Sequence, residues 1–146
     1  MKTQTVGLLI GGVFPALLFG FSNIFQKAST RAGIGIGPFL IGIGLAVVAV
    51  GLTFLVGTGD GHFSFRSISY ASLLGIFWGS GMGAIALALS KYDISLSQLV
   101  PLYNMNTLIS VALALIVFSE WMRVNPLKLA IASLMIVLGG ILASKA

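Results

Sequence analysis

Long apolar stretches, separated by short polar segments that carry the charged residues, dominate the chain. Four uncharged stretches cover residues 3–26, 32–59, 67–90 and 94–119. A helix of about 20 residues crosses the hydrocarbon core of a bilayer, so each of the four is long enough. The last stretch, 129–144, is shorter, and it becomes long enough if its helix begins near Val124 and Lys128 snorkels to the interface.

This pattern predicts an all-α, polytopic membrane protein with five transmembrane helices in a single transmembrane domain, 1–146. The expected spans are 6–26, 34–56, 69–90, 95–118 and 127–144. The composition agrees, because 58% of the residues are hydrophobic and 8% are charged, whereas a soluble domain carries about 25% charged residues. The connections are too short to hold a soluble domain.

Composition also excludes several classes of partner and cofactor. The chain contains no cysteine, which excludes a disulfide framework and thiol-bound metals. The net charge of +5 is spread over the ends of the apolar stretches and forms no basic run. We therefore expect it to interact with anionic lipid headgroups and not with nucleic acid. No cofactor is expected.

The first apolar stretch follows Lys2 and could be a secretory signal peptide. Its apolar run continues well past Gly20, and the only cleavage-like sequence is Ala28-Ser29-Thr30. The sequence therefore favours an uncleaved first span.

The basic residues divide evenly between the two sides of the membrane if five helices cross it. Lys2, Arg66, Arg123 and Lys128 belong to one face, and Lys27, Arg31, Lys91 and Lys145 belong to the other. Orientation normally follows an excess of Lys and Arg on the cytoplasmic side. An even division leaves two alternatives open: either both orientations are inserted, or another signal selects one of them.

Proline and small residues mark where the helices bend and pack. Pro15 lies in the middle of the first span and is expected to kink it. The same span repeats small residues every four positions, at Gly12, Ala16 and Gly20. The third span carries a double GxxxG pattern at Gly75, Gly79 and Gly83. Such patterns allow two helices to approach closely.

None of the ionisable residues falls in the middle of a span. Asp60, Asp93 and Glu120 lie at the ends of spans, and His62 lies in a loop. A cation moved through a low-dielectric site needs a counter-charge, so export of lipophilic cations is not expected. No metal-ligand spacing and no nucleophile–base pairing is visible, and enzymatic activity is not expected either. Glu120 is expected to cap the turn into the last helix.

Uncharged polar residues gather on the fourth span. Tyr103, Asn106, Thr107 and Ser110 follow the i, i+3, i+4, i+7 spacing of one helical face. An amide in hydrocarbon is costly unless it is hydrogen-bonded, so this stripe should face another helix or a wet cavity. Two further candidates are Asn23, which shares one face of the first span with Ser22 and Gln26, and Trp78 at mid-depth in the third span. Packing or interfacial hydration would explain each of them without a ligand.

Several marks of the first, fourth and fifth spans form a set. The stretch "SKYDISLSQLVPLYNMNTLISVALALIVFSEW" carries Pro101 early in the fourth span and Glu120 at its end, and Gly139-Gly140 follows late in the fifth. The first span contains the segment "FGFSNIFQKA". With these marks the chain resembles a single EamA-type repeat of the drug/metabolite transporter superfamily, and that segment is similar to the opening helix of the repeat. The first span lacks the glutamate on which four-span multidrug relatives rely.

The resemblance implies a multi-pass transporter of the inner cell membrane that acts as an antiparallel homodimer or with a paired chain. We expect a small neutral or zwitterionic polar metabolite as its solute, moved by alternating access. The solute would contact Tyr103, Asn106, Thr107, Ser110, Trp78 and Asn23. The alternative is a non-transporting assembly or regulatory subunit that uses its small-xxx-small faces to bind another membrane protein.

Overall fold

A computed structural model describes residues 2–122 and 124–145, with side-chain environments from Thr5 onward. The protein is 85% helical. Within the described residues, five helices are long and apolar enough to cross a membrane: Thr5–Arg31, Ile36–Thr58, Phe65–Lys91, Leu96–Val117 and Pro126–Ser144. The predicted all-α, multi-pass membrane architecture is confirmed.

The chain forms two compact units, Met1–Asp93 and Ile94–Ala146, which we describe separately. The first unit holds three of the spans and the second holds two. Two members of the predicted charge division, Arg123 and the side chain of Lys2, lie outside the residues described.

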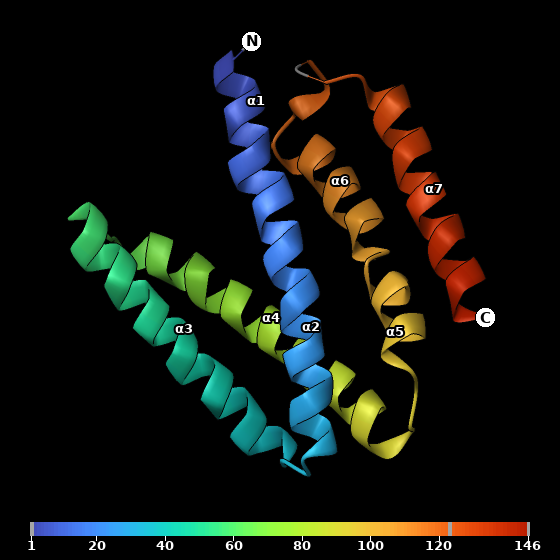
Figure 1. Ribbon diagram of the computed structural model, residues 1–146. Coiled ribbons are helices and arrows are strands. Elements are labelled where there is room, and N and C mark those ends of the chain that lie inside the picture. Colours follow the sequence, from blue (N-terminus) through green and yellow to red (C-terminus); the bar gives the residue numbers. More distant parts are fainter. Residues whose placement is uncertain (1, 123, 146) are drawn as a thin grey trace. The chain divides into compact units, whose positions relative to one another are not determined.

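The first span is a continuous helical rod made of three segments (Figure 1). These are α1 (Lys2–Leu8), a π-helical turn (Leu9–Val13) and α2 (Phe14–Arg31). The N–H of Phe14 donates to the carbonyl of Leu9, five residues earlier. Proline has no N–H, and its ring would press on the carbonyl four residues before it. The chain accommodates Pro15 by a wider π turn directly before it, at the place where the sequence predicts a kink.

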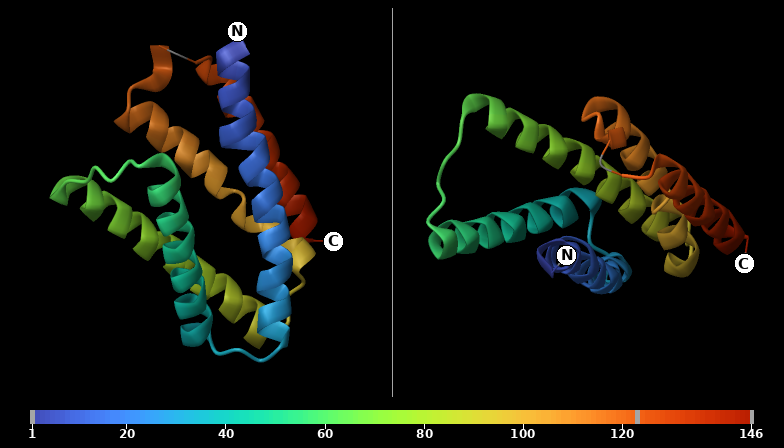
Figure 2. Two further views of the ribbon diagram at one scale, coloured as in Figure 1. Left: turned by 60° about the vertical axis from the view of Figure 1, so that its left-hand side comes forward. Right: turned by 90° about the horizontal axis from the view of Figure 1, so that it is seen from above.

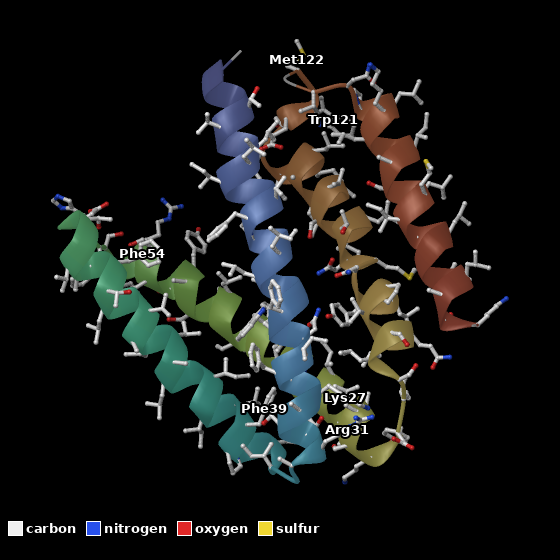
Figure 3. All side chains as sticks on the ribbon, viewed as in Figure 1. Lys27, Arg31, Phe39, Phe54, Trp121 and Met122 are labelled. Carbon is white, nitrogen blue, oxygen red and sulfur yellow. The ribbon has the colours of Figure 1, made fainter. Side chains whose placement is uncertain are left out.

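The first span continues five residues beyond the predicted end at residue 26. Two local features extend it. The hydroxyl of Thr30 donates to the carbonyls of Gln26 and Lys27, at 3.2 and 3.0 Å, and the N–H of Ala32 donates to the carbonyl of Ala28. Lys27 and Arg31 therefore lie on the last turns of the helix and not in a loop (Figure 3).

The second and third spans have well-defined ends. α3 (Ile36–Thr58) ends at Gly59, whose positive φ of 65° suits glycine. α4 (Phe65–Lys91) begins with a capping box, in which Ser64 and Ser67 each accept a hydrogen bond from the other's backbone N–H, at 3.1 and 2.8 Å. This reciprocal cap starts the helix four residues before the predicted residue 69.

Both α2 and α3 pack against α4 in the first unit. A Cβ added at Gly83 of α4 would lie 3.3 Å from Leu40 and 3.7 Å from Ile36. The beginning of α3 therefore approaches α4 closely. α3 and α4 diverge towards the segment 59–64 that joins them (Figure 2). Of the double GxxxG pattern, only Gly83 makes such a contact, because added Cβ atoms at Gly75 and Gly79 would meet nothing within 4 Å.

The second unit contains a broken span. α5 (Leu96–Tyr103) and α6 (Asn106–Val117) are separated by a turn at residues 104–105. The N–H of Met105 donates to the carbonyl of Leu102, three residues earlier, at 3.2 Å, where a regular α-helix would use Pro101. The fourth span was predicted as one continuous helix over 95–118, and this break is a departure from that prediction.

The last span, α7 (Pro126–Ser144), packs against both halves of the broken span. It follows a short 3₁₀ turn, η2 (Glu120–Met122). The cap of α7 is Asn125, whose side-chain oxygen accepts from the N–H of Lys128 at 3.0 Å. The prediction that Glu120 would cap this helix is therefore wrong, since an Asn directly before Pro126 lies at the N-cap position.

The small core suits a protein that spans a membrane. Phe39, Ala86, Leu89 and Leu115 are the buried hydrophobic residues among those described. Most large apolar side chains point outward from the helices (Figure 3). In water such a surface would be unstable, whereas in a bilayer lipid tails cover it at no hydrophobic cost.

Candidate functional site

The first unit contains a cavity of about 390 Å³ among its three spans. That volume falls in the range of small-molecule sites, about 300–1,000 Å³. Its walls come from the end of α2, the segment that joins α2 to α3, the first half of α3 and the middle of α4: Ser22, Phe25, Gln26, Ser29, Ile34, Pro38, Phe39, Gly42, Ile43, Ala46, Trp78 and Met82.

Helical periodicity explains why these side chains meet. Ser22, Gln26 and Ser29 recur at i, i+4 and i+7 on α2, and Trp78 and Met82 are one turn apart on α4, so each set lies on one helical face. On α3, Gly42 brings no side chain into the space, and an added Cβ there would meet nothing within 4 Å. The absence of a side chain at Gly42 therefore leaves space in the cavity.

The cavity has a buried side and an exposed rim. Gln26 and Phe39 are 3% and 6% exposed, while Phe25 and Trp78 are 73% and 46% exposed. Figure 3 shows Phe39 near the beginning of α3. A ligand would therefore enter past aromatic rings and meet the Gln26 amide on the buried side.

The amide of Gln26 is incompletely hydrogen-bonded. Its Nε2 donates to the backbone carbonyl of Met82 over 3.5 Å, which is long for such a bond. Its Oε1 is buried and has no hydrogen-bond partner among the described residues. The carbonyl of Met82 determines which end of the amide is the donor, because the opposite orientation would place two acceptor oxygens against each other. Gln26 thus lines the cavity with part of its side chain, and its Oε1 is a buried acceptor without a partner.

Among the residues that the structure describes, no charged side chain lines the cavity. Because an ion in a low-dielectric site is costly without a counter-charge, this cavity favours uncharged groups. The described residues also bring together no group of three His, Asp or Glu side chains that could hold a metal ion.

The six predicted site residues divide between the two units. Trp78 lines the cavity of the first unit. Asn23 lies on α2 beside that lining, is partly exposed, and is not one of the lining residues. The fourth-span residues Tyr103, Asn106, Thr107 and Ser110 all belong to the second unit.

The break in the fourth span changes the predicted polar stripe. Tyr103 is the last residue of α5, whereas Asn106, Thr107 and Ser110 lie on α6. A turn with i to i+3 hydrogen bonds winds more tightly than an α-helix, so the spacing that assigned all four to one face does not hold across it. The hydroxyl of Thr107 donates to the carbonyl of Asn104 at 2.7 Å and stabilises the break. Asn106 and Ser110 are exposed.

Gln26 is a polar residue of the cavity that was not among the six predicted site residues. Its position near the end of the first span suggested interfacial hydration. The signal that could have identified it is its spacing from Ser22 and Ser29, which marks a polar face one turn beyond the expected helix end. Gln26 is buried because α2 packs against α4, and no local sequence pattern predicts that contact.

A comparison with protein-family models found no match, and comparisons with curated proteins and with solved structures also found none. The resemblance to an EamA-type repeat therefore stays a prediction from the sequence.

Proposed function

We propose that this protein is a transporter of the inner cell membrane for a small neutral or zwitterionic polar metabolite. The observation that carries the proposal is the cavity of the first unit, which three spans form and which has Gln26 on its buried side. Because no described charged side chain lines it, the cavity supports the neutral alternative over the zwitterionic one. The resemblance to an EamA-type repeat supports the same function. We further propose alternating access in an antiparallel homodimer or with a paired chain.

The broken fourth span is a second feature that supports transport. Interrupted helices in transporters expose backbone groups to a solute or ion near the middle of the membrane. Here the interruption follows Pro101 and is flanked by Tyr103 and Asn106. We therefore propose that the four polar residues of this span contact the solute: Tyr103, Asn106, Thr107 and Ser110.

Uptake into proteoliposomes across a panel of metabolites, with and without a proton gradient, tests the proposal. Two glycines of α3 provide a matched pair of variants. An added Cβ meets nothing within 4 Å at Gly42 or at Gly44, but only Gly42 lines the cavity. We expect Gly42→Leu to fill part of the cavity and reduce uptake, because a solute site depends on a largely pre-formed pocket. Gly44→Leu should transport like the wild type.

Two results would count against the proposal. If the wild-type protein moves no solute of the panel, transport of this class is not its function. If Gly42→Leu transports at the wild-type rate, the cavity is not on the solute path.

A specific observation also favours the alternative of an assembly or regulatory subunit. Gly75 and Gly79 present an open small-residue face on α4, where added Cβ atoms would meet nothing within 4 Å. Such a face is suited to another transmembrane helix. Copurification of an unrelated membrane protein that is lost in Gly79→Leu, together with no transport by the wild type, would favour this function.

A further inference from the structure

We infer that the cavity of the first unit binds an uncharged molecule with an apolar body and one hydrogen-bond donor, and that Oε1 of Gln26 accepts that hydrogen bond. This inference deepens the proposed function, because it names the chemical class of ligand for the same cavity. It predicts binding and needs no transport step.

The need for a donor follows from the state of the Gln26 amide. Its Oε1 is buried without a partner, and its Nε2 has a single bond at the long distance of 3.5 Å. A buried polar group without a partner is destabilising, and within a membrane little water is available to satisfy it. A ligand that supplies an N–H or O–H removes this deficit, whereas a ligand that offers only acceptors does not. Because Oε1 itself is buried, the amide must turn for a donor in the cavity to reach it, and among the described residues the only hydrogen bond of the amide that opposes this turn is the long one to Met82.

The apolar body follows from the rest of the wall. Phe25, Phe39 and Trp78 contribute aromatic rings, and Ile34, Ile43 and Met82 contribute apolar surface. The other polar groups of the wall are the hydroxyls of Ser22 and Ser29 and the indole N–H of Trp78, and the Ser22 hydroxyl already donates to the carbonyl of Phe19 at 2.9 Å. With no charged side chain in the wall, a charged headgroup would lose its hydration without compensation.

Phenol and anisole form a matched pair of probes. Both carry the same ring, but only phenol has a hydrogen-bond donor. Trp78 lies in the cavity wall, and the other tryptophan, Trp121, lies in the second unit (Figure 3). The Trp121→Phe protein therefore reports binding through the fluorescence of Trp78 alone. Each probe is titrated into this purified full-length protein and into the same protein with Gln26→Met.

We expect Gln26→Met to weaken phenol binding roughly fivefold, as expected for one net hydrogen bond, and to change anisole binding by less than about twofold. Comparing the two proteins with the same probe cancels its partition into detergent. Gln98→Met is the control, because Gln98 lies in the second unit and accepts from Ser95 at 2.7 Å. It should leave the binding of both probes unchanged.

Equal losses for phenol and anisole would overturn the inference, as would the absence of phenol binding to the wild type. If Gln26→Met does not fold, Gln26→Asn replaces it, since this change keeps the amide but withdraws it by one methylene. Retention of the full preference for phenol in Gln26→Asn would equally overturn the inference. A protein that shows the preference but transports nothing removes the transport proposal and leaves the binding site intact.

Discussion

Gly140 of α7 lies directly against the carbonyl oxygen of Pro101 of α5. A Cβ added at Gly140 would be 2.8 Å from that oxygen and 3.2 Å from Cγ of Met105. Pro101 precedes the break in the fourth span, where the N–H of Met105 donates to Leu102. The two features belong together: α7 can approach the backbone at the break because it has no side chain at this position.

We therefore expect Gly140→Ala to lower the free energy of unfolding of the protein by about 2 kcal/mol, the typical cost of overpacking. The clash is with backbone, so no side chain can turn away to relieve it. Gly139→Ala is the matched control, because a Cβ at Gly139 would meet nothing within 4 Å. Thermal unfolding in detergent measures both variants, and equal stability of the two would contradict the contact.

Two glycines of α4 should respond differently to leucine. Gly83→Leu would collide with Leu40 and Ile36 of α3, and we expect a loss of about 1–3 kcal/mol in stability. Gly79→Leu has open space within the unit and should leave the stability of a single chain unchanged.

If the open face of Gly75 and Gly79 pairs with another chain, Gly79→Leu should abolish that association while the fold survives. Crosslinking in membranes followed by gel electrophoresis measures association. A Gly79→Leu protein that assembles like the wild type would show that these glycines face lipid.

Asn106 distinguishes a solute contact from a purely structural residue. It is exposed at the beginning of α6, and its amide offers a donor and an acceptor. We expect Asn106→Ala to reduce transport while thermal stability stays near that of the wild type. If Asn106 instead joins helices, the substitution should cost about 0.6 kcal/mol for the lost interhelical hydrogen bond and spare transport.

Tyr103→Phe is the finer probe of the same region, because it removes only a hydroxyl. Tyr103 lies on the other side of the break, at the end of α5. Unchanged transport by a protein with both substitutions would exclude these residues as solute contacts and direct attention to Trp78 and Gln26.

The even division of the eight basic residues leaves insertion in both orientations as one of two alternatives, and we test it as a hypothesis. Reporter fusions at the C-terminus should detect it on both sides of the membrane. Two lysines added beside Arg66 should shift the population to one orientation. A wild-type protein with a single C-terminal location would mean that another signal determines its topology.

The sequence by itself determined that the protein is helical and crosses the membrane, and it located all five spans to within a few residues. Long uncharged stretches require helices in a bilayer, because every backbone polar group must be hydrogen-bonded within its own segment. Local side-chain hydrogen bonds determine the two helix ends that the prediction misplaced. Thr30 extends the first span to Arg31, and the Ser64–Ser67 box starts α4 early. These are short-range patterns that a closer sequence analysis could include.

Only the tertiary structure decided which polar residues lie in a cavity and which small residues carry close contacts. The apolar pattern is nearly uniform around α3, α4 and α7, so it does not indicate which face meets a neighbouring helix. Gln26 became a buried group at a cavity because α2 packs on α4 next to Met82. In the same way, Gly83 and Gly140 pack tightly while Gly79 and Gly139 stay open. In a membrane, lipid and helix are equally apolar, and only the packing of helices distinguishes these faces.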